Sequence, residues 1–213
     1  MKQLSFKFVS LFVLVGAVAC SELSNTSKGF ENYTGPQVIS HDVFMRMSDS
    51  GKLKSNMEAK IQLILQDEDQ EFPEGVHIIV FDNKEQKQTE INAEYAYYDN
   101  QSKKWDLVCY NLVNFVNDSV VKSDARSERA FYYEDSSFWD LKGDVILNDH
   151  STEQKIETQA LTWQRESGDV RVPKGTQVQL TENRTKITGY QLEGNTYDSI
   201  NYRLYNVVGI APL

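Results

Sequence analysis

Apolar and polar residues alternate along most of the chain after about residue 38, in short runs that end at turn signals. In the clearest run, 139–147, one parity carries Trp139, Leu141, Gly143, Val145 and Leu147. The opposite parity begins with three charged residues, Asp140, Lys142 and Asp144. A period of two is typical of a β-strand with one buried face and one wet face. Because no helical periodicity follows residue 38, the pattern predicts an all-β, antiparallel protein.

A longer repeat is superimposed on this alternation. A unit made of an aromatic–acid pair, a polar turn and an alternating strand recurs roughly every 30 to 35 residues, within the range of repeat architectures. Its copies begin at Tyr98, Tyr133 and Tyr197, and a fainter copy begins at Trp163. Units of such an array bury their apolar faces on their neighbours. We therefore expect a stack of β-hairpins.

The apolar faces of these hairpins admit two interpretations. Two sheets packed face to face would make a closed sandwich, in which the apolar stripe is an ordinary core. Stacked hairpins with open ends would instead enclose an apolar channel suited to a long acyl chain. The candidate groove residues are Trp105, Leu107, Trp139, Leu141, Val145, Leu147 and Trp163. Cys109 shares the parity of Leu107, and one extra residue at Tyr110 predicts a β-bulge there.

The N-terminal segment predicts export. Two lysines, Lys2 and Lys7, precede an apolar run of twelve residues, 8–19, which suits a signal peptide and is too short for the ~20 residues of a membrane-spanning helix. Small residues lead directly into Cys20, as in the lipobox of bacterial lipoproteins. We expect residues 1–20 to be a lipoprotein signal peptide with Cys20 lipidated. The alternatives are an ordinary cleaved signal and a short uncleaved anchor, and each places the remainder outside the cytoplasm.

Composition and charge predict the domain boundaries and exclude one class of partner. Residues 21–37 are rich in Ser, Asn, Thr and Gly and predict a flexible tether, so that the folded domain spans 38–213. The net charge of the whole chain is −9, and removal of two lysines with the signal makes it −11. Since no basic stripe offsets this charge, nucleic acid is not an expected partner. Cys109 has no partner other than the lipid site, so no disulfide framework is expected.

Sequence motifs for catalysis and for metal binding are absent. The three histidines, His41, His77 and His150, are scattered, and no Cys-x-x-Cys or His-Glu-x-x-His spacing occurs. No Gly-x-Ser-x-Gly elbow occurs either. We expect a protein that is not an enzyme and that has neither a metal site nor a cofactor.

Several motifs together resemble the LptC family, whose members are membrane-anchored periplasmic components of lipopolysaccharide export. The elements that carry the resemblance are the lipobox at Cys20, the polar tether, the 49–51 turn, the 71–75 element, the repeated aromatic–acid units, and the closing segment 202–207 with Gly209. The resemblance covers nearly all of 31–213. Members of the family are usually held by a transmembrane helix, whereas this chain has a lipobox.

The resemblance implies a twisted, V-shaped antiparallel β-jelly roll. Its apolar groove would receive the acyl chains of lipopolysaccharide from an inner-membrane ABC transporter and pass them to a periplasmic bridge protein of the LptA type. A terminal strand from Asn201 to Gly209 would be the edge that pairs with the bridge protein, through Tyr202, Leu204, Asn206 and Val207. Strands near 43–47 would face the transporter. The implied location is the periplasmic side of the envelope, lipid-anchored, at the inner rather than the outer membrane.

The alternative function is a lipid-anchored, closed β-sandwich that binds glycan on exposed aromatic residues or acts as an envelope scaffold. Glycan binding would place aromatic side chains on the wet face. Trp105 and Trp139 instead share their parity with Leu107 and Leu141.

Overall fold

The computed structural model of the protein describes residues 34–116, 118–182, 184–196 and 201–212, and the part from Gly35 onward forms one compact unit. The predicted signal peptide, the predicted lipidation site Cys20 and most of the predicted tether lie outside the described residues. The first strand of the described part begins at Val38.

Fourteen strands make up the described part, together with one short 3₁₀ turn, η1 (Glu134–Ser136). The strands are β1 (Val38–Asp49), β2 (Lys52–Ile64), β3 (Gln70–Phe72), β4 (Val76–Phe81), β5 (Lys87–Ala93), β6 (Tyr95–Asp99), β7 (Lys104–Val116), β8 (Val120–Tyr133), β9 (Phe138–Asp149), β10 (Gln154–Gln164), β11 (Asp169–Glu182), β12 (Thr185–Asn195), β13 (Asn201–Leu204) and β14 (Gly209–Pro212).

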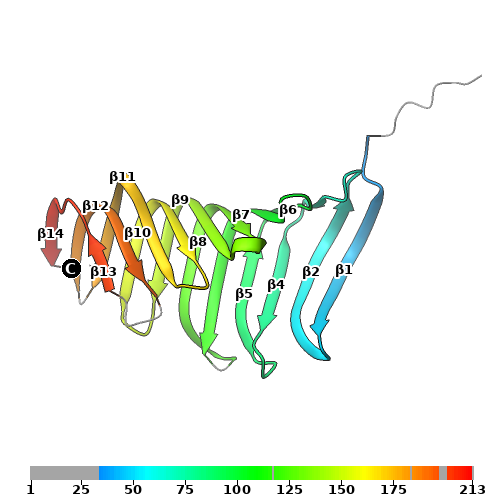
Figure 1. Ribbon diagram of the computed structural model, residues 1–213, viewed down its shortest axis with the longest axis horizontal. Helices are drawn as coiled ribbons and strands as arrows, with labels where there is room; N and C mark the ends of the chain where they lie inside the picture. The colour runs from blue at the N-terminus through cyan, green and yellow to red at the C-terminus, as the bar shows by residue number, and fades with distance from the viewer. Residues whose placement is uncertain (1–33, 117, 183, 197–200, 213) are drawn as a thin grey trace, which may run out of the picture. The chain divides into compact units, whose positions relative to one another are not determined.

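All strand pairs are antiparallel, and the strands follow one another in a single sheet (Figure 1). From β7 to β12 each strand pairs with the next one in the chain, as expected of stacked hairpins. β1 pairs with β2 at one end, and β13 and β14 both pair with β12 at the other. The predicted all-β, antiparallel jelly roll is therefore confirmed. No helix in the described part of the chain has the length and apolar character needed to span a membrane.

The sheet bends back on itself along a line through the middle of its long strands. In β7, residues 104–108 pair with β6 whereas residues 111–114 pair with β5, and Cys109 between them has a φ of 51°. Gly143, Asp144 and Gln191 have positive φ at the matching level of β9 and β12. Register shifts interrupt the neighbouring ladders at the same level. We call the half of the sheet that contains β6 and β13 the first wall, and the half that contains β4, β5 and β14 the second wall.

Two facing sheets were expected, each with its own strands. The two walls are instead halves of the same strands, joined through a line of bulges. A bulge adds twist and bends a strand without ending it, so one strand contributes to both walls. The predicted bulge at Tyr110 is absent, because Val108 pairs with Arg129 and Tyr110 with Ser127 in unbroken register; it is the positive φ of Cys109 that changes the direction of the side chains. Tyr110 is therefore buried, whereas Cys109 is exposed and does not share the buried face of Leu107.

The inward-facing residues align into rows that cross the strands. The inner row of the first wall consists of Phe72, Ala96, Leu107, Ala130, Leu141, Leu161, Val172, Leu192 and Leu204. The inner row of the second wall consists of Met45, Met57, Ile78, Ile91, Leu112, Ala125, Leu147, Ile156, Leu180, Ile187 and Ile210. The row of the second wall continues from β1 at one end of the sheet to β14 at the other.

Candidate functional site

The predicted groove residues all lie on inward-facing positions of the described sheet. Leu107 and Leu141 belong to the inner row of the first wall, and Leu147 belongs to the inner row of the second. Val145 is fully buried next to the bend. Trp105, Trp139 and Trp163 lie on a further row of the first wall, two residues along each strand from the apolar row.

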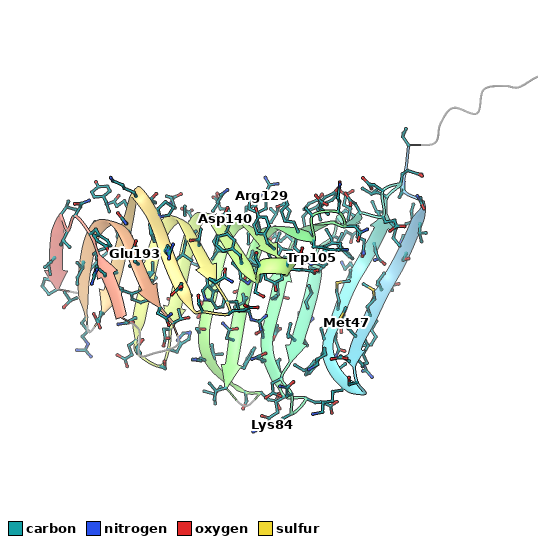
Figure 2. The ribbon with its side chains drawn as sticks, viewed as in Figure 1. Met47, Lys84, Trp105, Arg129, Asp140 and Glu193 are labelled. Carbon is teal, nitrogen blue, oxygen red and sulfur yellow. The ribbon has the colours of Figure 1, made fainter. Side chains whose placement is uncertain are left out.

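This further row is rich in aromatic residues, and we call its members Tyr98, Trp105, Tyr132, Trp139, Trp163 and Tyr202 the aromatic row. Two pairs of neighbouring rings are in contact: the centroids of Tyr98 and Trp105 lie 4.9 Å apart, and those of Tyr132 and Trp139 lie 4.5 Å apart. Glu134 in η1 accepts hydrogen bonds from Trp105 Nε1 at 2.9 Å and from the Tyr98 hydroxyl at 3.2 Å. Of the aromatic–acid pairs in the repeat, Tyr98 and Glu134 therefore meet at this row through Trp105, which is labelled in Figure 2.

A polar row faces inward on the second wall, two residues beyond its apolar row. Its members are Thr89, Asn114, Ser123, Asp149 and Gln154. The Thr89 hydroxyl donates to Asn114 Oδ1 at 3.0 Å, and Asn114 Nδ2 donates to Ser123 Oγ at 3.0 Å. Sequence analysis missed this row, although its members keep the parity of Ile91, Leu112 and Ala125. The signal that would have found it is the strand register, which aligns these separate polar residues.

A cavity of about 190 Å³ lies between the walls, beside the aromatic and polar rows. Among the predicted groove residues, Leu141, Leu147 and Trp163 line it, and Tyr202 also contributes. Trp105, Leu107, Trp139 and Val145 are not part of its lining. Sites for small molecules commonly enclose about 300 to 1,000 Å³. The interior is therefore mostly packed, and a long chain requires the walls to separate.

The outer face of the first wall is polar, as the alternation predicted. Asp106 on β7 forms a two-point ion pair with Arg129 on β8, and Lys142 lies 3.0 Å from Asp140 on β9. Arg129, Asp140 and Glu193 are labelled in Figure 2. The exposed Cys109 donates to Glu94, and this contact raises the pKa of the thiol. No cluster of three or more His, Cys, Asp or Glu side chains in the described ranges is arranged to hold a metal ion.

The C-terminal edge differs from the predicted single strand between Asn201 and Gly209. β13 ends at Leu204 and β14 begins at Gly209, and the two pair with separate halves of β12. Asn206 and Val207 lie in the connection between them, and Asn206 has a φ of 47°. Tyr202 and Leu204 pack against the core, whereas Val207 is 50% exposed. The strand breaks here because the chain crosses the bend of the sheet at this point.

The opposite edge is formed by β1, whose only partner among the described strands is β2. Large apolar side chains are exposed along it, namely those of Val38, Ile39, Phe44, Met45 and Met47. Met47, at 66% exposure, is the most exposed of them (Figure 2). Native sheets usually protect such an edge with charges, prolines or a covering element.

The tyrosines of the interior predict a loss of stability at alkaline pH. Burial raises the pKa of Tyr98 to about 12, with a further contribution from Glu134, and burial also raises the pKa values of Tyr110 and Tyr202. An unfolded tyrosine ionises near pH 10, so this stabilisation is complete below about pH 10 and is lost as the pH rises toward the folded pKa.

We expect the urea midpoint of the protein to fall steadily as the pH rises from about 10 to about 12. A Tyr110→Phe variant serves as the control, because it lacks the most deeply buried hydroxyl and its midpoint should fall less over the same interval. Equal midpoints across this range in the wild-type protein would contradict the prediction.

Comparison with known proteins identifies one family. The family model described as "Lipopolysaccharide-assembly, LptC-related" matches residues 64–208, which is more than half of the 213 residues. The match begins at the last residue of β2 and extends past β13, so it includes β3 to β13 and all the residues that line the cavity, and it leaves out β1 and β14. No curated protein matches the chain.

Proposed function

Because the chain belongs to the LptC-related family of lipopolysaccharide-assembly proteins, we propose that the space between its two walls receives the acyl chains of lipopolysaccharide and passes them along the sheet. Membership of the family gives the chain a role in lipopolysaccharide transport and assembly at the periplasmic side of the envelope. Members of the family are transport and assembly components, and the family is not a known family of enzymes.

The observation that carries the proposal is the apolar row of the second wall. It runs without interruption from Met45 on β1 to Ile210 on β14, across the whole sheet. Each exposed methylene of an acyl chain costs about 0.8 kcal/mol in water, so a lipid needs a continuous apolar surface to cross an aqueous space. A row that ends inside the domain would hold a ligand, whereas a row that runs from β1 at one end of the sheet to β14 at the other supports transfer.

Loading requires movement, because the cavity of about 190 Å³ is small and most of the apolar side chains are already packed. The line of positive-φ residues through Cys109, Gly143 and Gln191 is the place where the walls join, and opening there would separate the two inner rows without breaking a strand. The energy for this step would come from an ATPase elsewhere, which is consistent with transfer from an inner-membrane ABC transporter.

The two ends of the sheet supply the partner surfaces of the proposal. β1 has a free edge with exposed apolar residues and is proposed to face the transporter. β13 and β14 each have one unpaired edge and are proposed to pair with a bridge protein of the LptA type by strand addition. Lipidation of Cys20 is proposed to hold the protein at the inner membrane, where contact with the transporter is possible.

Site-specific photocrosslinking in cells tests the proposal. A photoreactive residue at Leu147 or at Trp163 would face the cavity, and one at the exposed Lys142 would face the solvent on the neighbouring wall. We expect lipopolysaccharide adducts from the first two positions and none from the third. Folded protein without adducts at any position would refute the acyl-chain proposal.

A sealed core is the alternative that such a negative result would favour. Val145, Val170, Val178 and Leu192 have no exposed surface, so much of the interior is packed as in an ordinary domain. The protein would then act as a lipid-anchored scaffold or bind glycan on its surface.

A further inference from the structure

Two indole N–H groups inside the sheet have no hydrogen-bond acceptor. Nε1 of Trp139 and Nε1 of Trp163 are buried, and neither donates to a described residue. The two tryptophans are register partners on β9 and β10. Trp105, on the same row, donates instead to Glu134 at 2.9 Å. Because buried donors in native proteins are nearly always paired, this pair indicates where an acceptor from another molecule binds.

The cavity beside Trp163 is suited to the chain attached to such an acceptor. Leucine side chains line it from both walls, namely Leu112 and Leu147 from the second and Leu141 and Leu161 from the first. A plain hydrocarbon would fit this lining but would leave the Trp163 donor unpaired. An acyl chain meets both conditions, because its carbonyl oxygen accepts a hydrogen bond and its methylenes contact the leucines.

The opposite side of the cavity is compatible with the polar linkage of such a chain. Thr89, Asn114 and Ser123 of the polar row line it and are hydrogen-bonded to one another. These three side chains make their hydrogen bonds to one another. They therefore do not accept the hydrogen bond that the Trp163 N–H would donate to a ligand. The cavity therefore presents an apolar floor and a polar side, and Trp163, a residue of its lining, carries a buried donor without an acceptor.

We propose that this cavity is a subsite for the carbonyl end of a fatty acyl chain joined through an amide or ester, with the N–H of Trp163 donating to the carbonyl oxygen. The inference rests on the proposed function and adds the part of the lipid that the protein recognises. It makes Trp163 a specificity-determining residue that distinguishes acyl chains from alkyl chains.

Binding of two amphiphiles with the same chain length tests this subsite. N-dodecanoyl glucosamine carries an amide carbonyl, whereas dodecyl glucoside carries none. The full-length protein is placed in nanodiscs of diether phospholipid, whose chains also lack carbonyls, and calorimetric titrations are corrected with empty nanodiscs. We expect Trp163→Phe to weaken binding of the amide about fivefold, the effect of one neutral hydrogen bond, and to leave binding of the glucoside unchanged.

Trp105→Phe is the matched control, because it removes an indole N–H of the same row that already has an acceptor. We expect it to change the affinity for neither probe. An equal loss for both probes in Trp163→Phe, or no loss for either, would overturn the subsite while the acyl-chain function stands. Failure of both probes to bind the wild-type protein would instead overturn the proposed function itself.

Discussion

Replacement of Leu141 by aspartate is expected to destabilise the domain by about 3 to 5 kcal/mol, enough to unfold a protein of ordinary stability. Leu141 is 2% exposed, and its register partners in the inner row, Ala130 and Leu161, are equally buried. An aspartate at this position would have to bury a carboxylate without a partner or bind a proton. Urea unfolding followed by circular dichroism measures the loss.

Lys142→Ala is the control for this prediction. Lys142 is the next residue on β9 and is exposed on the outer face, where its ion pair with Asp140 at 3.0 Å is a surface interaction. Such pairs contribute at most about 1 kcal/mol, so the midpoint should change little. A Leu141→Asp variant that kept the wild-type midpoint would show that the space between the walls admits water even without lipid.

Replacement of Gly75 by alanine is expected to cost about 2 to 4 kcal/mol, from a strained backbone together with a steric clash. Gly75 closes the turn between β3 and β4, and its N–H donates to Phe72 O at 3.1 Å. Its φ is 84°, and a Cβ atom there would lie 2.3 Å from the carbonyl oxygen of Ala93. Since that oxygen belongs to the backbone of β5, a side-chain rotation cannot relieve the contact.

Gly51→Ala separates the two contributions. Gly51 has a similar φ of 78°, but a Cβ atom at this position meets nothing within 4 Å. The variant should lose only the conformational contribution, about 1 kcal/mol. Thermal unfolding of the two variants, measured side by side, checks this explanation. Equal losses of stability in the two variants would contradict it.

The alternation of residues was sufficient to identify the faces of the strands. Leu107, Trp139 and Leu141 are directed inward and Lys142 outward because successive side chains of a strand point to opposite faces, a consequence of local geometry alone. The strand class and the stacking of hairpins followed from the same pattern and from the repeated turns.

Local geometry was insufficient where the position of a bulge or a strand end depended on neighbouring strands. The predicted bulge at Tyr110 relied on the sequence of β7 alone, whereas in the sheet Tyr110 stays in register with Ser127 and it is Cys109 that takes the left-handed conformation. The terminal segment likewise divides at Asn206, since its two parts pair with different walls.

The sequence by itself determined an antiparallel β-protein with one apolar and one polar face per strand, because these properties depend on residue type and on a period of two. Only the tertiary structure decided that both walls belong to one sheet and that Trp163, Leu147 and Thr89 line one cavity. It also showed that Trp105 has an acceptor whereas Trp139 and Trp163 have none. These features depend on the register between strands distant in the sequence, and register arises from the packing of the whole sheet.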